Sequence, residues 1–135
     1  MKLLLIISLM LTCQVLNTYD RREHPPPEPP QTEWDKLIEA LIHVESNGDS
    51  LIVNSIGATG WLQIMPIYVK DINRIIGRDE YTMNCALSGK RSIEMFNIYQ
   101  DYYNPTRDIQ KAIKLHNPRA GEWYKQRVIN QLKKL

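Results

Sequence analysis

Apolar residues recur at steps of three and four residues through most of the chain after residue 31. This spacing gathers them on one face of an α-helix, as in a helix that packs one side against a core. Thr32, with Asp35 three residues later, forms a weak capping box, and Gly48 offers a stop. The segment between Thr32 and Gly48 is therefore predicted to be a helix. Its apolar positions are Trp34, Leu37, Ile38, Leu41, Ile42 and Val44.

The remaining periodic segments predict four more helices. They cover residues 66–76, residues 93–103, about 108–115, and a final stretch that contains Tyr124, Val128, Leu132 and Leu135. Pro66 suits a first helical turn, Gly77 offers a stop, and Asn104-Pro105 ends the third segment. Strand-forming patterns are confined to residues 51–53 and 62–64, so any sheet is small. The predicted fold class is all-α, or α with a minimal β element.

Composition places the chain among single-domain globular proteins. Of its 135 residues, 43% are hydrophobic and 24% are charged, and this length suits one domain. The 17 basic and 15 acidic residues leave a formal charge of +2, which is too small to indicate a nucleic-acid-binding protein. The two cysteines and the histidines show no spacing typical of a zinc site. No metal and no cofactor are expected.

The first residues resemble an export signal. Lys2 precedes an apolar run from Leu3 to Leu11, which is far shorter than the roughly 20 residues that span a bilayer. A buried N-terminal helix is the alternative, but the run shows no amphipathic period. Cys13 offers a site for lipid attachment and so for membrane anchoring. Residues 1–18 are therefore predicted to be a signal peptide or a lipoprotein signal, and the protein is expected to be exported to the periplasm or cell envelope, free or lipid-anchored.

A proline-rich segment separates this leader from the helical part. Five of the eight prolines lie between Pro25 and Pro30. Because proline lacks an amide donor and fixes φ, the segment is expected to be an extended, solvated spacer. Residues 19–31 are predicted to be a linker, and residues 32–135 are predicted to form the single folded domain.

Glu45 breaks the pattern of the first helix. It lies four residues after Leu41 and eight after Leu37, on the apolar face rather than on the solvent face. One interpretation is an acid at a frayed helix end that points to solvent. The other is a buried carboxyl that is paired or has a raised pKa, as a general acid requires. The helical period by itself leaves both interpretations open.

A glycine-rich motif follows Glu45 and Ser46 after a polar stretch. It reads Gly57-Ala58-Thr59-Gly60-Trp61-Leu62-Gln63-Ile64-Met65-Pro66. The two glycines allow a tight turn in which the backbone can approach a ligand closely. Trp61 and Gln63 are residue types that stack on sugar rings and hydrogen-bond to their substituents, although Trp61 also suits a core. Together with the Glu-Ser pair, the motif resembles the lytic transglycosylase (SLT) domain of the goose-type lysozyme superfamily, over residues 34–123.

That resemblance implies a lysozyme-like catalytic domain with a substrate cleft. In the family, the glutamate of the Glu-Ser pair is the single catalytic acid and base, which corresponds to Glu45. Gln63 and Met65 correspond to residues that line the glycan groove, although the residue pattern by itself suggests that Met65 belongs to the core. Ser46 is expected beside them as a further substrate contact.

Two positions depart from the family pattern. The family carries a serine three residues before its Gly-Ala pair, where this chain has Asn54 followed by Ser55, and either can bind a substrate N-acetyl group. The family segment Ala-x-x-x-Tyr-Asn-x-Gly has His116 here in place of the tyrosine that faces the catalytic glutamate, and Asn117 is retained. His116 is either a contact of Glu45 or an exposed residue in a turn. A charged imidazole beside Glu45 would lower the pKa of that carboxyl.

The resemblance implies an enzyme that cleaves the β-1,4 bond between N-acetylmuramic acid and N-acetylglucosamine and forms a 1,6-anhydro product. Neither Asp49 nor Asp71 is placed as a second carboxylate, so the N-acetyl and 6-hydroxyl groups of the substrate would complete the chemistry. A hydrolytic muramidase and a non-catalytic glycan-binding component of an envelope machine are the alternatives. The expected partner is the peptidoglycan glycan strand, and a secretion or conjugation apparatus is a further candidate.

The mature protein should lack the residues up to about Leu11, through signal cleavage or through lipidation at Cys13. Intact-mass measurement on protein from its native compartment checks this prediction, because the two routes differ by the mass of the lipid. A full-length species in the cytosol would contradict the export prediction.

Overall fold

The computed structural model describes residues 29–135. The predicted leader, Cys13 and the first part of the predicted linker lie outside the described residues. The residues from Gln31 to Leu135 form one compact unit, which contains every helix described below.

The first helix, α1 (Glu33–Ser46), begins at a complete capping box. The Thr32 side chain accepts a hydrogen bond from the backbone N–H of Asp35, and the Asp35 carboxylate accepts one from the backbone N–H of Thr32. These contacts satisfy amide groups that the start of a helix leaves free. The helix is capped at Asn47, in the left-handed conformation, one residue before the predicted stop at Gly48.

The four later helices predicted from the sequence are also present. They are α2 (Pro66–Ile76), α3 (Gly89–Tyr103), α4 (Ile109–His116) and α5 (Glu122–Leu132). The apolar spacing does not predict η2 (Met83–Leu87), because a 3-10 helix this short shows no period. The prediction of an all-α fold is confirmed. Among residues 29–135, no helix combines the length and apolarity needed to cross a membrane.

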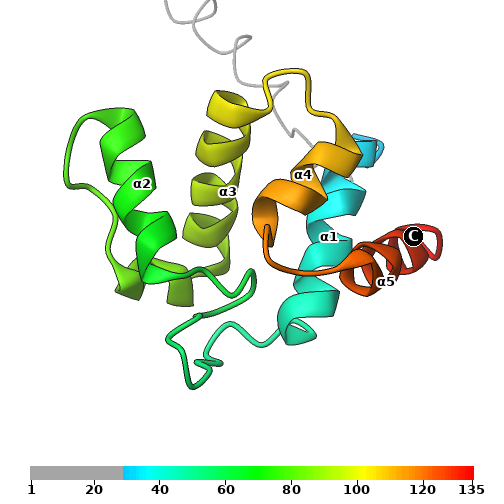
Figure 1. The fold of residues 1–135 in the computed structure, drawn as a ribbon, viewed down its shortest axis with the longest axis horizontal. Helices are drawn as coiled ribbons and strands as arrows, with labels where there is room; N and C mark the ends of the chain where they lie inside the picture. Colours follow the sequence, from blue (N-terminus) through cyan, green and yellow to red (C-terminus); the bar gives the residue numbers. More distant parts are fainter. Residues whose placement is uncertain (1–28) are drawn as a thin grey trace, which may run out of the picture. The chain divides into compact units, whose positions relative to one another are not determined.

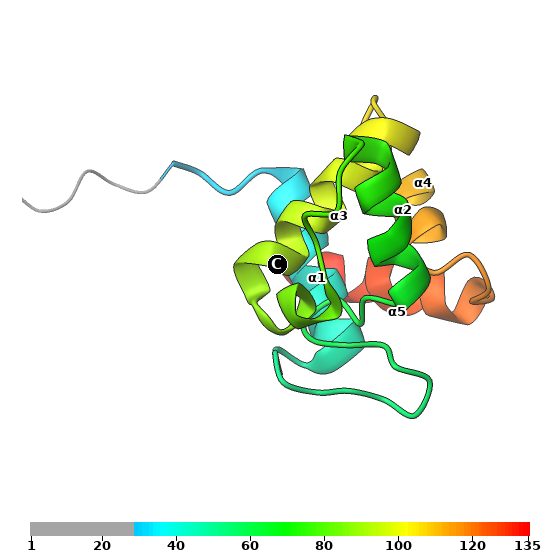
Figure 2. The same ribbon diagram turned by 90° about the vertical axis from the view of Figure 1, so that its left-hand side faces the viewer.

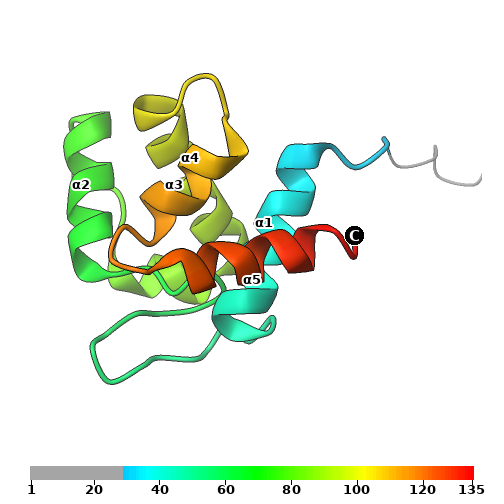
Figure 3. The same cartoon turned by 45° about the vertical axis from the view of Figure 1, so that its right-hand side comes forward.

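Pairwise packing of these helices builds the core (Figure 1). α1 packs against α5, α2 packs against α3, and α4 also contacts α5. Figure 3 shows α5 running across α1. The packing therefore holds α1 against a helix that lies far from it in the sequence. The largest side chains at 0–1% exposure are Phe96, Leu37, Leu41, Leu62, Ile64, Ile72, Met95 and Ile113.

The segment between α1 and α2, residues 47–65, is a long loop rather than a sheet (Figure 2). Isolated antiparallel bridges join Thr59 to Val53 and to Ile64, and no ladder extends from them in the described part of the chain. The minimal β element expected from residues 51–53 and 62–64 is reduced to these bridges. Positive φ angles, which turn the chain too sharply for a longer ladder, occur at Gly57, Gly60 and Gln63.

Gly60 is the position in this loop where a side chain is least tolerable. Its φ is +74°, and its N–H donates a 2.8 Å hydrogen bond to the backbone oxygen of Ile52. A Cβ at this position would lie 1.9 Å from the backbone oxygen of Ala86, at the end of η2. The loop therefore contacts η2 backbone to backbone, which only glycine permits.

Gly60→Ala should lower the free energy of unfolding by at least about 2 kcal/mol more than Gly48→Ala. Both glycines have positive φ, but a Cβ at Gly48 meets no heavy atom within 4 Å, so the control carries the left-handed strain without the clash. Urea unfolding followed by circular dichroism measures the difference. Equal losses in the two variants would contradict the close approach at Gly60.

Candidate active site

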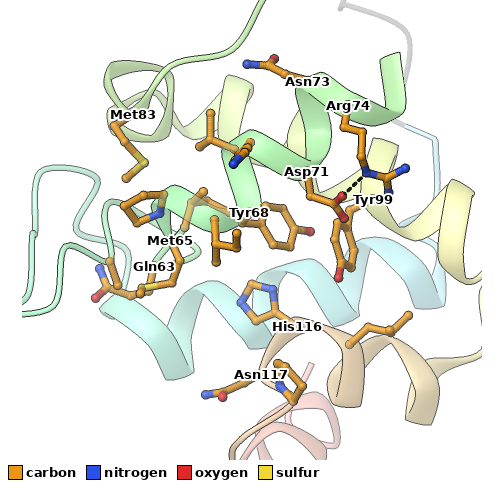
Figure 4. A pocket seen from close by; sticks show the side chains of 18 of the residues that line it. Gln63, Met65, Tyr68, Asp71, Asn73, Arg74, Met83, Tyr99, His116 and Asn117 are labelled. Carbon is orange, nitrogen blue, oxygen red and sulfur yellow. Dashed lines mark hydrogen bonds and ion pairs between the residues drawn. The ribbon is translucent and has the colours of Figure 1, made fainter. Parts of the chain in front are cut away.

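A pocket of about 1440 Å³ opens beside Glu45. Its walls come from the glycine-rich loop, from α2, and from the end of α4 with the loop that follows (Figure 4). This volume exceeds the roughly 300–1,000 Å³ of ordinary small-molecule sites. The pocket therefore suits an extended ligand better than a compact one.

Glu45 is largely buried and paired rather than exposed at a frayed helix end. It lies in the last turn of α1, and its side chain is 14% exposed. The Tyr124 hydroxyl on α5 donates a hydrogen bond to Glu45 Oε1. Nε2 of His116, the last residue of α4, lies 3.5 Å from the same oxygen. Within residues 29–135, no hydrogen bond reaches Oε2.

The pKa of Glu45 lies below its ordinary value. Burial raises this pKa, but the hydrogen bond and positive charge of the facing His116 imidazole lower it, and the Tyr124 hydroxyl and Arg127 lower it further. The interpretation that included a raised pKa is therefore wrong in direction. A raised pKa is expected where burial dominates, and the groups that outweigh burial here come from α4 and α5.

Sequence reasoning missed Tyr124 as a residue of the site. Its spacing with Val128 identifies the apolar face of α5, and its side chain is 5% exposed. Burial and the negative charge of Glu45 raise the pKa of the Tyr124 hydroxyl, so the hydroxyl keeps its proton and remains a donor. The available signal is the residue type, because a tyrosine on a buried face needs a partner for its hydroxyl. The resemblance suggests that the His116 imidazole replaces the tyrosine that faces the glutamate. In the structure, His116 and the Tyr124 phenol both contact Glu45.

His116 is buried at the end of a helix and does not lie exposed in a turn. Its side chain is 4% exposed. The imidazole packs at steep angles against Phe96, with ring centroids 5.7 Å apart, and against Tyr68, at 6.5 Å. Figure 4 shows His116 between Tyr68 and Asn117. Of the two interpretations left open by the sequence, the contact with Glu45 is the one observed.

Gln63, Met65 and Asn117 all line the pocket, as the resemblance implies. Gln63 has a left-handed φ of 47°, and its amide nitrogen donates a 3.1 Å hydrogen bond to the backbone oxygen of Gly60. Met65 caps the start of α2, and Asn117 caps the end of α4. Each of the three therefore sits at a chain turn that fixes its backbone, with the side chain at the pocket wall.

Ser46 and Trp61 anchor the loop and do not line the pocket. The Ser46 hydroxyl donates a 2.9 Å hydrogen bond to the backbone oxygen of Trp61, and Trp61 Nε1 donates to the backbone oxygen of Gly48. A Cβ at Gly89 would lie 2.4 Å from the Trp61 ring, so the indole covers the start of α3. The expectation that Ser46 contacts substrate therefore does not fit its position, and Trp61 belongs with the core.

Asn54 and Ser55 are separated by the fold. Asn54 lines the pocket, and its Oδ1 accepts hydrogen bonds from the backbone N–H groups of Ile56 and Ala58. Ser55 is exposed and lies outside the pocket lining. Only Asn54 is therefore placed to reach a bound ligand, through the amide group that also stabilises the loop.

The other carboxylates are poorly placed to assist Glu45. Asp71 lines the pocket, but its Oδ1 accepts a 2.7 Å hydrogen bond from Arg74 Nε and its Oδ2 accepts a 2.8 Å bond from the Tyr103 hydroxyl. Asp79, at the pocket rim, is exposed, and Asp49 lies outside the lining. Residues 29–135 contain no group of three or more His, Cys, Asp or Glu side chains arranged to hold a metal ion.

Tyr124→Phe should raise the pKa of Glu45, because it removes a donor that stabilises the ionised carboxylate and keeps the ring that fills the core. Carbon-13 NMR titration of the glutamate carboxyls measures the shift. The matched control is Tyr102→Phe, which removes a hydroxyl from an exposed side chain. An unchanged Glu45 titration in Tyr124→Phe would show that the phenol does not stabilise the carboxylate.

Comparison with known proteins gives one match. The family model described as the transglycosylase SLT domain matches residues 30–127, which is most of the chain. No curated protein and no solved structure matches the chain significantly. SLT domains are lysozyme-like and mostly helical, in agreement with the fold described above, and they act on peptidoglycan in the periplasm or envelope. The chain therefore belongs to the transglycosylase SLT domain family.

Proposed function

We propose that the protein is an exported lytic transglycosylase. It cleaves the β-1,4 bond between N-acetylmuramic acid and N-acetylglucosamine in peptidoglycan strands. The observation that carries the proposal is the buried Glu45 carboxyl, held through one oxygen by donors from two other helices at the wall of a large pocket. The second oxygen, Oε2, has no hydrogen-bond partner among residues 29–135 and is left for the ligand. Family membership supplies the class of substrate.

In the first step, Glu45 acts as the acid. It donates its proton to the glycosidic oxygen as the bond from C1 of N-acetylmuramic acid to that oxygen breaks, and the bonding electrons leave with N-acetylglucosamine. The N-acetyl oxygen of the muramic residue stabilises the positive charge at C1. The lowered pKa of Glu45 opposes this step in an open pocket. A glycan strand that fills the pocket removes water from the carboxyl, which favours its neutral form.

In the second step, the ionised Glu45 acts as the base. It takes the proton from the 6-hydroxyl of the same muramic residue, and the 6-oxygen forms a bond to C1, which closes the 1,6-anhydro ring. No water is consumed, and Glu45 regains the proton that it gave away. Between the two steps, Tyr124 and His116 stabilise the carboxylate through Oε1.

The same arrangement argues against a mechanism with two carboxylates. Ordinary glycosidases place a second carboxylate about 5 Å or about 6.5–9.5 Å from the acid. Asp71 has both oxygens occupied by Arg74 and Tyr103, so it is a poor nucleophile and a poor base. The paired Glu45 also argues against a non-catalytic, glycan-binding component, because glycan binding by itself does not require a carboxylate that is costly to bury and needs two partners to hold it.

Pocket residues of two kinds suit a glycan strand. The amides of Asn54, Gln63 and Asn117 can hydrogen-bond to N-acetyl and hydroxyl groups, and Met65 offers an apolar contact to a sugar ring. We place the activity in the periplasm or cell envelope, where the substrate lies. A secretion or conjugation apparatus would be a partner of the protein there.

Glu45→Gln should reduce glycan cleavage by roughly 10²–10⁴-fold or more while the fold stays intact, because glutamine keeps the acceptor for Tyr124 but cannot transfer the proton. The measurement is mass spectrometry of the products released from purified sacculi, in which the 1,6-anhydro ring is lighter than the reducing sugar by one water. Circular dichroism confirms that the variant is folded.

The matched control is Glu39→Gln, which changes an exposed carboxylate on the same helix. Wild-type-like activity in Glu45→Gln would remove Glu45 from the mechanism. Products with free reducing ends would identify a hydrolytic muramidase instead. Binding of glycan without any product from the wild-type protein would indicate the non-catalytic alternative.

A further inference from the structure

The two nitrogens of His116 have different surroundings. Nε2 lies 3.5 Å from Glu45 Oε1. Nδ1 is buried and has no hydrogen-bond partner among the described residues. The ring is enclosed by the aromatic side chains of Phe96 and Tyr68. The imidazole therefore has a polar partner at Nε2 and none among the described residues at Nδ1.

These surroundings favour one protonation state when Glu45 carries its own proton. A neutral imidazole has one N–H donor and one lone pair, whereas the cation has two donors. A buried N–H without an acceptor loses its hydration and gains nothing in return. With its proton on Nε2, neutral His116 directs its only donor at Glu45 and leaves a lone pair at Nδ1. The cation would bury an unpartnered N–H at Nδ1 and would have no carboxylate charge to offset it.

We propose that His116 is a positioning residue for Glu45, acting as a neutral imidazole with its proton on Nε2. In this form it donates to Oε1 alongside Tyr124, so that both acceptor sites of Oε1 are occupied and the acid proton of Glu45 lies on Oε2. Oε2 is the oxygen that no residue among 29–135 binds. The catalytic use of the Glu45 proton rests on the proposed function. The protonation state of His116 can be tested independently of that function.

The cationic form of His116 would oppose the reaction in two ways. It would stabilise the ionised Glu45, which cannot supply a proton. It would also place a positive charge beside a transition state in which positive charge develops on the sugar ring. Protonation of His116 should therefore lower kcat, and the loss should appear on the acid side of the pH profile.

Few other groups near His116 can produce this loss of kcat on the acid side of the pH profile, which we call the acid limb. Glu45 faces His116 from α1, Tyr68 faces it from α2, and Tyr124 and Arg127 face Glu45 from α5, while α3 contributes Phe96, which does not titrate. Burial raises the pKa of both tyrosines, so they remain neutral phenols, and arginine remains charged. Of this set, Glu45 and His116 are therefore the groups that can exchange a proton.

The kinetic test compares His116→Gln with His116→Ala. Glutamine can present an N–H near the position of Nε2 but does not titrate, so it should keep kcat within about tenfold of wild type and lose the acid limb. Alanine removes the donor, so kcat should fall by about tenfold or more with little change in KM. His43→Gln, at an exposed histidine of α1, is the control and should keep the limb. An acid limb that persists in His116→Gln, or an effect on KM alone, would overturn the proposal.

The second test needs no turnover. In Glu45→Gln, residue 45 is neutral like the acid-ready carboxyl, and nitrogen-15 NMR of the imidazole reports which nitrogen carries the proton. We expect a neutral His116 with its proton on Nε2, and a proton on Nδ1 would overturn the assignment. If the wild-type protein formed no anhydro product, the proposed function would fail, and this spectrum would still decide the state of His116.

Discussion

The placement of one carboxyl at the end of α1 is the constraint on which the rest of the site depends. Glu45 can be buried there only because α4 and α5 bring an imidazole and a phenol to the same oxygen. A buried carboxylate without such partners would be costly, and it would hold its proton too tightly to act as a base in the second step. The packing of α1 against α5 is therefore a condition for the proposed chemistry as well as for stability.

Two opposing effects act on the proton of Glu45. Burial favours the neutral acid, and the donors on Oε1 favour the carboxylate. A site that must first give a proton and then take one needs both, because an extreme pKa in either direction would block one of the two steps. Water exclusion by a bound glycan and the charge of His116 shift the balance in opposite directions. In the proposed mechanism, the pH dependence of the reaction therefore arises from Glu45 and His116.

The glycine-rich loop acts mainly by position. Gly60 lets the loop backbone contact η2, and Gly89 lets the Trp61 ring cover the start of α3. Ser46 then ties the end of α1 to the backbone of Trp61. These contacts hold Gln63 and Met65 at the pocket wall. Ser46 and Trp61, which resemble ligand contacts in the sequence, thus position the motif residues that do reach the pocket, Gln63 and Met65.

The sequence by itself determined the five helices, the all-α class and the residue at the centre of the site. Helical period and capping residues are local properties, and Glu45 is conspicuous because it occupies an apolar position in one helix. Only the tertiary structure decided that Tyr124 and His116 share Glu45 Oε1, that Ser46 and Ser55 lie outside the pocket, and that the pKa of Glu45 is lowered. These facts depend on contacts of α1 with α4 and α5, which lie 60 residues or more further along the chain. Local spacing carries no information about which of their side chains meet.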